Sequence, residues 1–194
     1  MIQLFTLEGI QKKAAVFDVT KLEWMNGQYL SALPPDELLA PVQRQLARME
    51  VSADGRDLRP LIDAVKARSR TILHVAEQVA VRLDPERSTL DSKGEALIRK
   101  MGPAFSTNLG FAADALEQVA PGDWNAEAVL GVVKGVAETH GLKLGDAMQP
   151  IRVALTGSTV SEPVNELLAV VGRDRSLQRL RTFAARGDGG VSAG

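Results

Sequence analysis

Apolar residues recur every three or four positions through most of this 194-residue chain, and no segment shows the sustained alternation of a strand. One such stripe consists of Leu61, Val65, Ile72, Val75 and Val79. Residues at this spacing share one face of a helix and can pack together. Aromatic residues make up only 4% of the chain, which favours packed helices over a β-sandwich. The pattern predicts an all-α fold.

Prolines, glycines and capping residues divide the pattern into separate helices. Thr20 is the expected N-cap of the first helix, and Asn125 is the expected N-cap of a helix in the second half. We expect helices over residues 21–33, 36–46, 58–83 with a break near 69–71, 90–100, 104–119, 126–140, 144–155, 164–171 and 176–185.

The strongest internal turn signal is Pro121-Gly122-Asp123. It predicts two helical subdomains, over residues 1–121 and 122–186. Residues 187–194 are small and polar, so we expect a disordered tail there.

The chain has no cysteine, which excludes disulfides and cysteine-ligated zinc and fits the reducing cytoplasm. We expect no signal peptide within residues 1–11, and no apolar run reaches the roughly 18 residues of a membrane span. The net charge of −1 counts mildly against a nucleic-acid binder. Basic residues do cluster locally, at Lys66, Arg68, Arg70 and at Arg173, Arg175, Arg179, Arg181, Arg186, although such clusters are often only solvated helix faces.

No residue pattern predicts a catalytic, cofactor-binding or metal site. The two histidines, His74 and His140, are too few for a histidine-rich metal site, and the acidic residues are scattered. Gly-rich phosphate-binding loops of the Walker or Rossmann type are absent from the sequence.

Two segments of the sequence carry distinctive motifs. The first runs from Ala14 to Leu30 and contains Phe-Asp, Lys-Leu, Trp-Met-Asn and Tyr. The second runs from Lys143 to Ser158 and contains Lys-Leu-Gly, Gln-Pro-Ile-Arg and Ala-Leu-Thr-Gly. In content and spacing, both segments resemble signatures of bacterial-type glutamyl-tRNA synthetases. Most letters of such signatures preserve the fold, and we expect Trp24, Tyr29, Leu144 and Leu155 to lie in the core.

The resemblance covers residues 5–181 and implies the C-terminal anticodon-binding region of the synthetase, with glutamate tRNA as its partner. The family's HIGH-type and KMSKS-type motifs do not occur in this sequence. The resemblance therefore implies that ATP and magnesium bind to a separate catalytic half of the same synthetase. It also implies that this catalytic half is a partner of the chain and that the protein is a monomer.

Arg68 matches the family's arginine for the third anticodon base, which is cytosine in glutamate tRNA and guanine in glutamine tRNA. A guanidinium has only donors, cytosine offers O2 and N3 as acceptors, and guanine presents donors instead. Arginine can therefore bind cytosine and disfavour guanine at this position. Without the resemblance, Arg68 would be interpreted as an ordinary surface arginine.

The remaining anticodon-binding residues are implied by position. Arg152 matches an arginine associated with the other anticodon bases, and a structural ion pair is an equally good interpretation. Ser161, Glu162 and Val164 match the loop that touches the first two bases, although the family often has proline where this chain has Glu162. Lys66 and Arg70 are expected phosphate contacts, together with the C-terminal arginines. The near-neutral charge and Glu162 leave one alternative open, a helical protein-interaction domain that no longer binds RNA.

Overall fold

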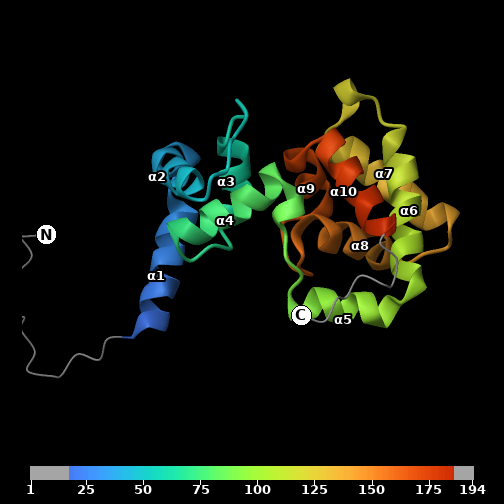
Figure 1. Ribbon diagram of the computed structural model, residues 1–194, viewed down its shortest axis with the longest axis horizontal. Helices are drawn as coiled ribbons and strands as arrows, with labels where there is room; N and C mark the ends of the chain where they lie inside the picture. The colour runs from blue at the N-terminus through green and yellow to red at the C-terminus, as the bar shows by residue number, and fades with distance from the viewer. Residues whose placement is uncertain (1–17, 186–194) are drawn as a thin grey trace, which may run out of the picture.

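The computed structural model describes residues 18–185, and within that range the chain forms ten α-helices, two 3₁₀ turns and no strand. The all-α expectation is confirmed. The elements are α1 (Val19–Ala32), α2 (Pro35–Arg48), α3 (Arg59–Lys66), α4 (Ile72–Leu83), η3 (Pro85–Arg87), α5 (Ser92–Met101), α6 (Pro103–Glu117), η4 (Pro121–Asp123), α7 (Ala126–Thr139), α8 (Leu144–Thr156), α9 (Val164–Val171) and α10 (Arg173–Ala185). Figure 1 shows α1–α4 as one body and α5–α10 as a second, joined by the segment after α4.

Each body has its own apolar core. The first core is built from buried residues between Leu30 and Leu83, and the second from buried residues between Phe105 and Leu180. The division between the cores therefore falls between Leu83 and Leu90, instead of at the boundary of 121 and 122 expected from the sequence. The tail expected over residues 187–194 lies outside the described residues.

The Pro121-Gly122-Asp123 turn lies inside the second body because the helices on both sides of it belong to one core. It forms η4, a short connection between α6 and α7, which pack against each other. The indole Nε1 of Trp124, directly after the turn, donates to the Leu168 carbonyl of α9 at 2.9 Å. A tight helix–helix connection and a domain linker have the same turn residues, so the sequence signal does not separate them.

Capping chemistry explains two helix starts. Asn125 caps α7 as expected, accepting from the Glu127 and Ala128 amides. The cap of α1 is Asp18, whose carboxylate accepts from the Lys21 amide, and Thr20 lies within the helix instead. The break expected near residues 69–71 is confirmed, because Thr71 caps α4 by accepting from the His74 amide.

Buried arginines connect the two bodies. Arg82 of α4 pairs with Glu162 ahead of α9, and Arg179 of α10 pairs with Glu86 of η3 at 2.6 Å. Arg56, ahead of α3, donates to the Val170 carbonyl of α9. Arg82 and Arg56 each bind an acceptor of the other body, and Arg179 binds the second body to the segment that joins the two. The arrangement of the bodies therefore depends on polar geometry as well as on apolar packing.

A close backbone approach fixes the end of α8. Gly157 has a φ of +74°, and a Cβ at this position would lie 1.9 Å from the Thr89 carbonyl oxygen. Its own carbonyl accepts from the Asp91 amide at 2.9 Å, and a Cβ on Gly94 would lie 2.6 Å from that carbonyl oxygen. Only glycine fits at residue 157 in this conformation. The loop that follows α8 therefore starts from a tightly held backbone.

An apolar face of α1 is exposed to solvent. The side chains of Trp24 and Tyr29 are 54% and 66% exposed, and Val19, Leu22 and Met25 are also exposed. The expectation that Trp24 and Tyr29 lie in the core is wrong, and Leu144 is exposed as well, whereas Leu155 is fully buried as expected. Helix α1 instead packs through Gly27 and Leu30, its buried residues.

Candidate nucleic-acid interface

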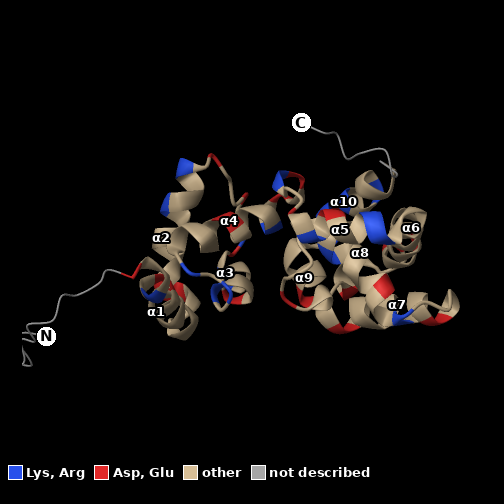
Figure 2. Ribbon diagram, turned by 90° about the horizontal axis from the view of Figure 1, so that it is seen from below, with Lys and Arg blue, Asp and Glu red and all other residues tan. Residues whose placement is uncertain are grey.

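A pocket of about 590 Å³ opens where the two bodies meet. Helix α4 and the end of α3 line one side, and the loop between α8 and α9 lines the other. Its polar lining includes Arg68, His74, Glu77, Gln78, Arg82, Arg87, Asp91, Thr156, Ser158, Ser161 and Glu162. Figure 2 shows positions of basic and acidic residues interspersed along the helices of both bodies.

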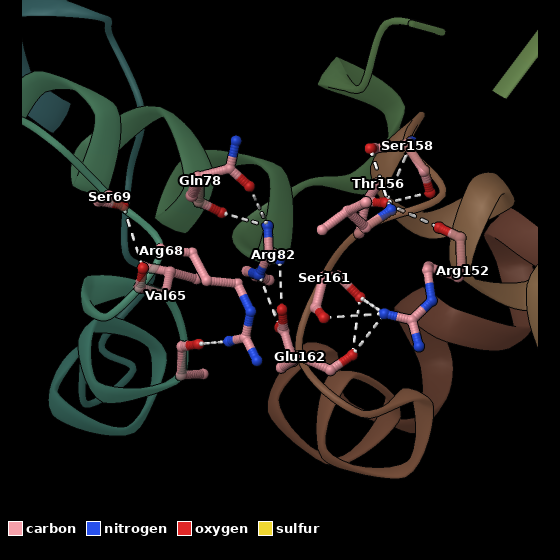
Figure 3. Close-up of polar contacts among 12 residues, drawn as sticks. Val65, Arg68, Ser69, Gln78, Arg82, Arg152, Thr156, Ser158, Ser161 and Glu162 are labelled. Atoms are coloured by element: carbon pink, nitrogen blue, oxygen red, sulfur yellow. Dashed lines mark hydrogen bonds and ion pairs between the residues drawn. The ribbon is translucent and has the colours of Figure 1, made fainter. Parts of the chain in front are cut away.

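Arg68 lies at the edge of this pocket with its side chain exposed. Its Nη1 donates to the Ala64 carbonyl at 3.2 Å, and the buried Ser69 next to it donates to the Val65 carbonyl. These contacts hold the turn after α3 and direct the guanidinium toward the loop that carries Ser161 and Glu162 (Figure 3). The position predicted for contact with a base is accessible.

Arg152 holds the loop from the side of α8. Its Nη1 donates to the Ser161 carbonyl at 2.9 Å, to Ser161 Oγ at 2.7 Å and to the Glu162 carbonyl at 2.8 Å. Burial lowers the pKa of the Arg152 guanidinium, the Glu162 carboxylate raises it, and Arg68 lowers it again. The partners of Arg152 are loop carbonyls and a hydroxyl, instead of the carboxylate that a structural ion pair would require, and its contact with an anticodon base stays a prediction.

Glu162 forms a two-pronged ion pair with Arg82. Arg82 Nε donates to Oε1 at 2.9 Å and Nη2 donates to Oε2 at 2.6 Å, while Nη1 donates to the Gln78 side chain at 2.9 Å. The side chains of Arg82 and Glu162 are 2% and 1% exposed. The expected contact between the Glu162 carboxylate and a base is therefore not available in this structure, because the carboxylate is buried and occupied.

The other predicted residues differ in accessibility. Val164 is buried in the second core, so its side chain does not line the pocket, whereas Ser161 does. Lys66 Nζ is mostly buried and donates to the Leu33 carbonyl at 2.8 Å, which ties α3 to the end of α1. Arg70 is exposed beside α1, and its role as a phosphate contact stays a prediction.

The C-terminal arginines mostly bind within the protein. Arg173 donates to the Val119 and Glu117 carbonyls, Arg175 pairs with Asp54, and Arg181 pairs with Asp114 and Glu117. With Arg179 buried between the bodies, these side chains stabilise the fold and are not arranged as a phosphate-binding surface. Arg186 lies outside the described residues.

Sequence reasoning missed Arg82, Gln78 and Val160. Arg82 continues the buried stripe of Val75 and Val79 at helical spacing, and a charge on such a stripe signals a buried partner. Val160 is 65% exposed in the loop after α8, on the rim of the pocket. Its isopropyl group is an exposed apolar surface at this rim.

Within residues 18–185, no three His, Asp or Glu side chains gather as a metal site would require. None of the helices in that range is long and apolar enough to cross a membrane.

Comparisons with known proteins agree with the resemblance. The chain is 36% identical to the glutamate–tRNA ligase of Acidothermus cellulolyticus, over 98% of this chain and 38% of that protein. It is 37% identical to glutamate–tRNA ligase 1 of Methylorubrum extorquens, over 93% of this chain and 39% of that protein. The chain thus spans about two fifths of the length of these relatives.

The fold is also found in solved structures. A glutamate–tRNA ligase from Elizabethkingia meningosepticum has a TM-score of 0.77 and 23% identity, covering 93% of this chain and 35% of that chain. The profile of the family described as an anticodon binding domain matches residues 28–184, a range that contains the pocket and both bodies apart from most of α1. The chain therefore belongs to the family of anticodon-binding domains.

Proposed function

We propose that this chain recognises the anticodon of glutamate tRNA as part of a glutamate–tRNA ligase. The proposal is supported by membership of the anticodon-binding family and by the similarity to glutamate–tRNA ligases. It is also supported by the accessible Arg68 at a polar pocket between two helical bodies. The attachment of glutamate, with ATP and magnesium, takes place on the remainder of the synthetase, which works as a monomer in the cytoplasm.

The observation that carries this proposal is the placement of Arg68. The pocket has room for a base, since its volume of about 590 Å³ exceeds what one nucleobase fills, and Arg68 supplies donors at its edge. On the opposite rim, Val160 supplies an apolar surface for the face of that base. Proteins recognise unstacked bases by hydrogen bonds to their edges and by contacts with their faces.

Replacing Arg68 by alanine is expected to lower the preference for cytosine over guanine at the third anticodon base by about 1–3 kcal/mol, or roughly 5- to 150-fold. Arg68→Gln should relax the preference less, because an amide both donates and accepts. The measurement is a fluorescence titration with glutamate tRNA, glutamine tRNA and a glutamate tRNA changed to guanine at that base, at low and moderate salt.

Arg44→Ala removes an exposed arginine of α2 outside the pocket lining and serves as the charge-matched control. It should weaken binding of all three tRNAs alike or leave it unchanged, since a general charge effect carries no base preference. Equal affinity of the wild-type chain for all three tRNAs would contradict the proposal. No detectable binding of any of them would also count against it.

The exposed face of α1 is proposed to contact the catalytic part of the same synthetase. This chain covers only 38% of its Acidothermus relative, so most of that ligase lies outside the matched region. The stripe of Leu22, Met25 and Tyr29 along α1 is exposed, and Trp24 is exposed on another side of the helix, which is unusual for large apolar residues on a surface in contact with water. Helix α1 also binds the turn beside Arg68, because Asn26 donates to the Arg70 carbonyl.

Tyr29→Lys is expected to weaken binding to the separately expressed remainder of the Acidothermus ligase at least tenfold in a calorimetric titration, because a lysine side chain would be desolvated at the contact. Leu73→Lys on α4 is the matched control, since Leu73 is also a large exposed apolar residue but lies outside α1. Equal binding by wild type and Tyr29→Lys would rule out this face as the contact.

A further inference from the structure

The ion pair of Arg82 and Glu162 joins the two walls of the pocket. Arg82 belongs to α4 in the first body, and Glu162 belongs to the loop ahead of α9 in the second. Both carboxylate oxygens accept from the guanidinium, at 2.9 and 2.6 Å. A bidentate pair fixes direction as well as distance, because the two donors and two acceptors lie in nearly one plane.

The same short loop is held from its other side by Arg152. Figure 3 shows Arg68 and Arg152 on opposite sides of the segment that carries Ser161 and Glu162, with Arg82 reaching that segment from α4. Arg152 binds main-chain carbonyls, so it ties the loop to α8 within the second body. Arg82 alone among these three arginines ties the loop across to the first body, where Arg68 lies.

Glu162 also holds the charges of the pocket together. The Glu162 carboxylate is paired with the buried Arg82, and both Glu162 and Arg68 act electrostatically on Arg152, with opposite signs. Loss of that carboxylate would leave Arg82 as a buried charge without its counter-ion, and repulsion among the arginines would favour separation of the two walls.

We infer that Arg82 and Glu162 are positioning residues that set the distance between Arg68 and the loop rim at Val160, and through it the base preference of the pocket. The inference rests on the proposed function, since it concerns the same pocket. Neither side chain touches the base, because both are buried. Their effect is therefore on the choice between bases, not on the general attraction to RNA.

The first test measures the pocket width without RNA. The chain has no cysteine, so Leu73→Cys and Val160→Cys place two nitroxide labels at exposed positions, one on α4 and one on the loop. In the otherwise wild-type chain, we expect pulsed electron paramagnetic resonance to give a narrow distribution of distances between the two labels. Adding Glu162→Gln should broaden the distribution or shift it to longer distances. An unchanged distribution would overturn the inference.

The second test measures base preference in variants that stay folded. The double variant Arg82→Met with Glu162→Leu removes the directional link but keeps the volume apolar, so it should unfold at or above the wild-type temperature. Its ratio of Kd values for the guanine- and cytosine-bearing tRNAs should fall at least fivefold. Partial unfolding weakens both affinities by the same factor, so that ratio reports positioning alone.

Glu166→Gln, an exposed acid in the first turn of α9, is the matched control and should keep the wild-type ratio. A folded double variant with the wild-type ratio would overturn the inference while the proposed function stands. A wild-type chain with no base preference would overturn both the proposed function and the claim that the ion pair affects base preference. The label distances would still decide whether the pair of Arg82 and Glu162 sets the width of the pocket.

Discussion

Replacing Gly157 by alanine is expected to lower the free energy of unfolding by about 3 kcal/mol, the combined effect of a left-handed backbone and an overpacked contact. The φ of +74° costs about 1–2 kcal/mol for a residue with a Cβ. The added carbon would also lie 1.9 Å from the Thr89 carbonyl oxygen, which is backbone and cannot rotate away. Urea unfolding followed by circular dichroism measures the change.

Gly131→Ala is the control for this prediction. Gly131 lies in the middle of α7, and a Cβ there meets no atom within 4 Å. Because alanine favours the helix over glycine by up to about 1 kcal/mol, this variant should be as stable as the wild type or more so. If Gly157→Ala unfolded at the wild-type urea concentration, the close approach of the α8 end to Thr89 would be wrong.

Replacing Arg179 by methionine is expected to cost about 3 kcal/mol of stability, as loss of a buried charged donor with several partners does. Its Nε donates to the Ala154 carbonyl at 2.8 Å. This carbonyl lies in the last turn of α8, where no amide of the same helix can donate to it. Its Nη2 donates to Ser88 at 2.9 Å, and its guanidinium lies 5.1 Å from the centre of the Phe183 ring. Methionine replaces only the hydrocarbon part of these contacts.

The comparison with Arg181, two residues along the same helix, tests the role of burial. Arg181 pairs with Asp114 and Glu117 at the surface, where an ion pair contributes about 0–1 kcal/mol. Arg181→Met should therefore lower the unfolding midpoint far less than Arg179→Met in the same urea titration. Similar losses in the two variants would contradict the larger role assigned to the buried guanidinium of Arg179.

The sequence predicted most helices because their apolar stripes and caps are local features. Asn125 and Thr71 bind amides within three residues of themselves, so their neighbours suffice to identify them. The cap of α1 was placed at Thr20 because threonine is a good cap, but Asp18 is also good and lies one residue before the helix. Local chemistry permits both, so the sequence does not separate them.

The division of the cores and the pair of Arg82 with Glu162 were not predicted, since both depend on contacts between distant segments. Eighty positions separate the two charged residues along the chain. The resemblance gave Glu162 an RNA-binding role by position, whereas only the fold brings α4 next to the loop after α8. The exposed face of α1 has a similar cause, because a stripe of Leu22, Met25 and Tyr29 predicts burial without saying what covers it.

The two bodies are joined by one short covalent segment, since each core comes from a continuous stretch of chain on one side of residues 84–89. A short tether holds the two bodies that it joins at an effective concentration on the order of millimolar. Association between the bodies therefore needs only a modest intrinsic affinity, and a few polar contacts at the junction suffice. During synthesis, the first body can close its core before α5 has left the ribosome, so the pocket between the bodies can form only after that core.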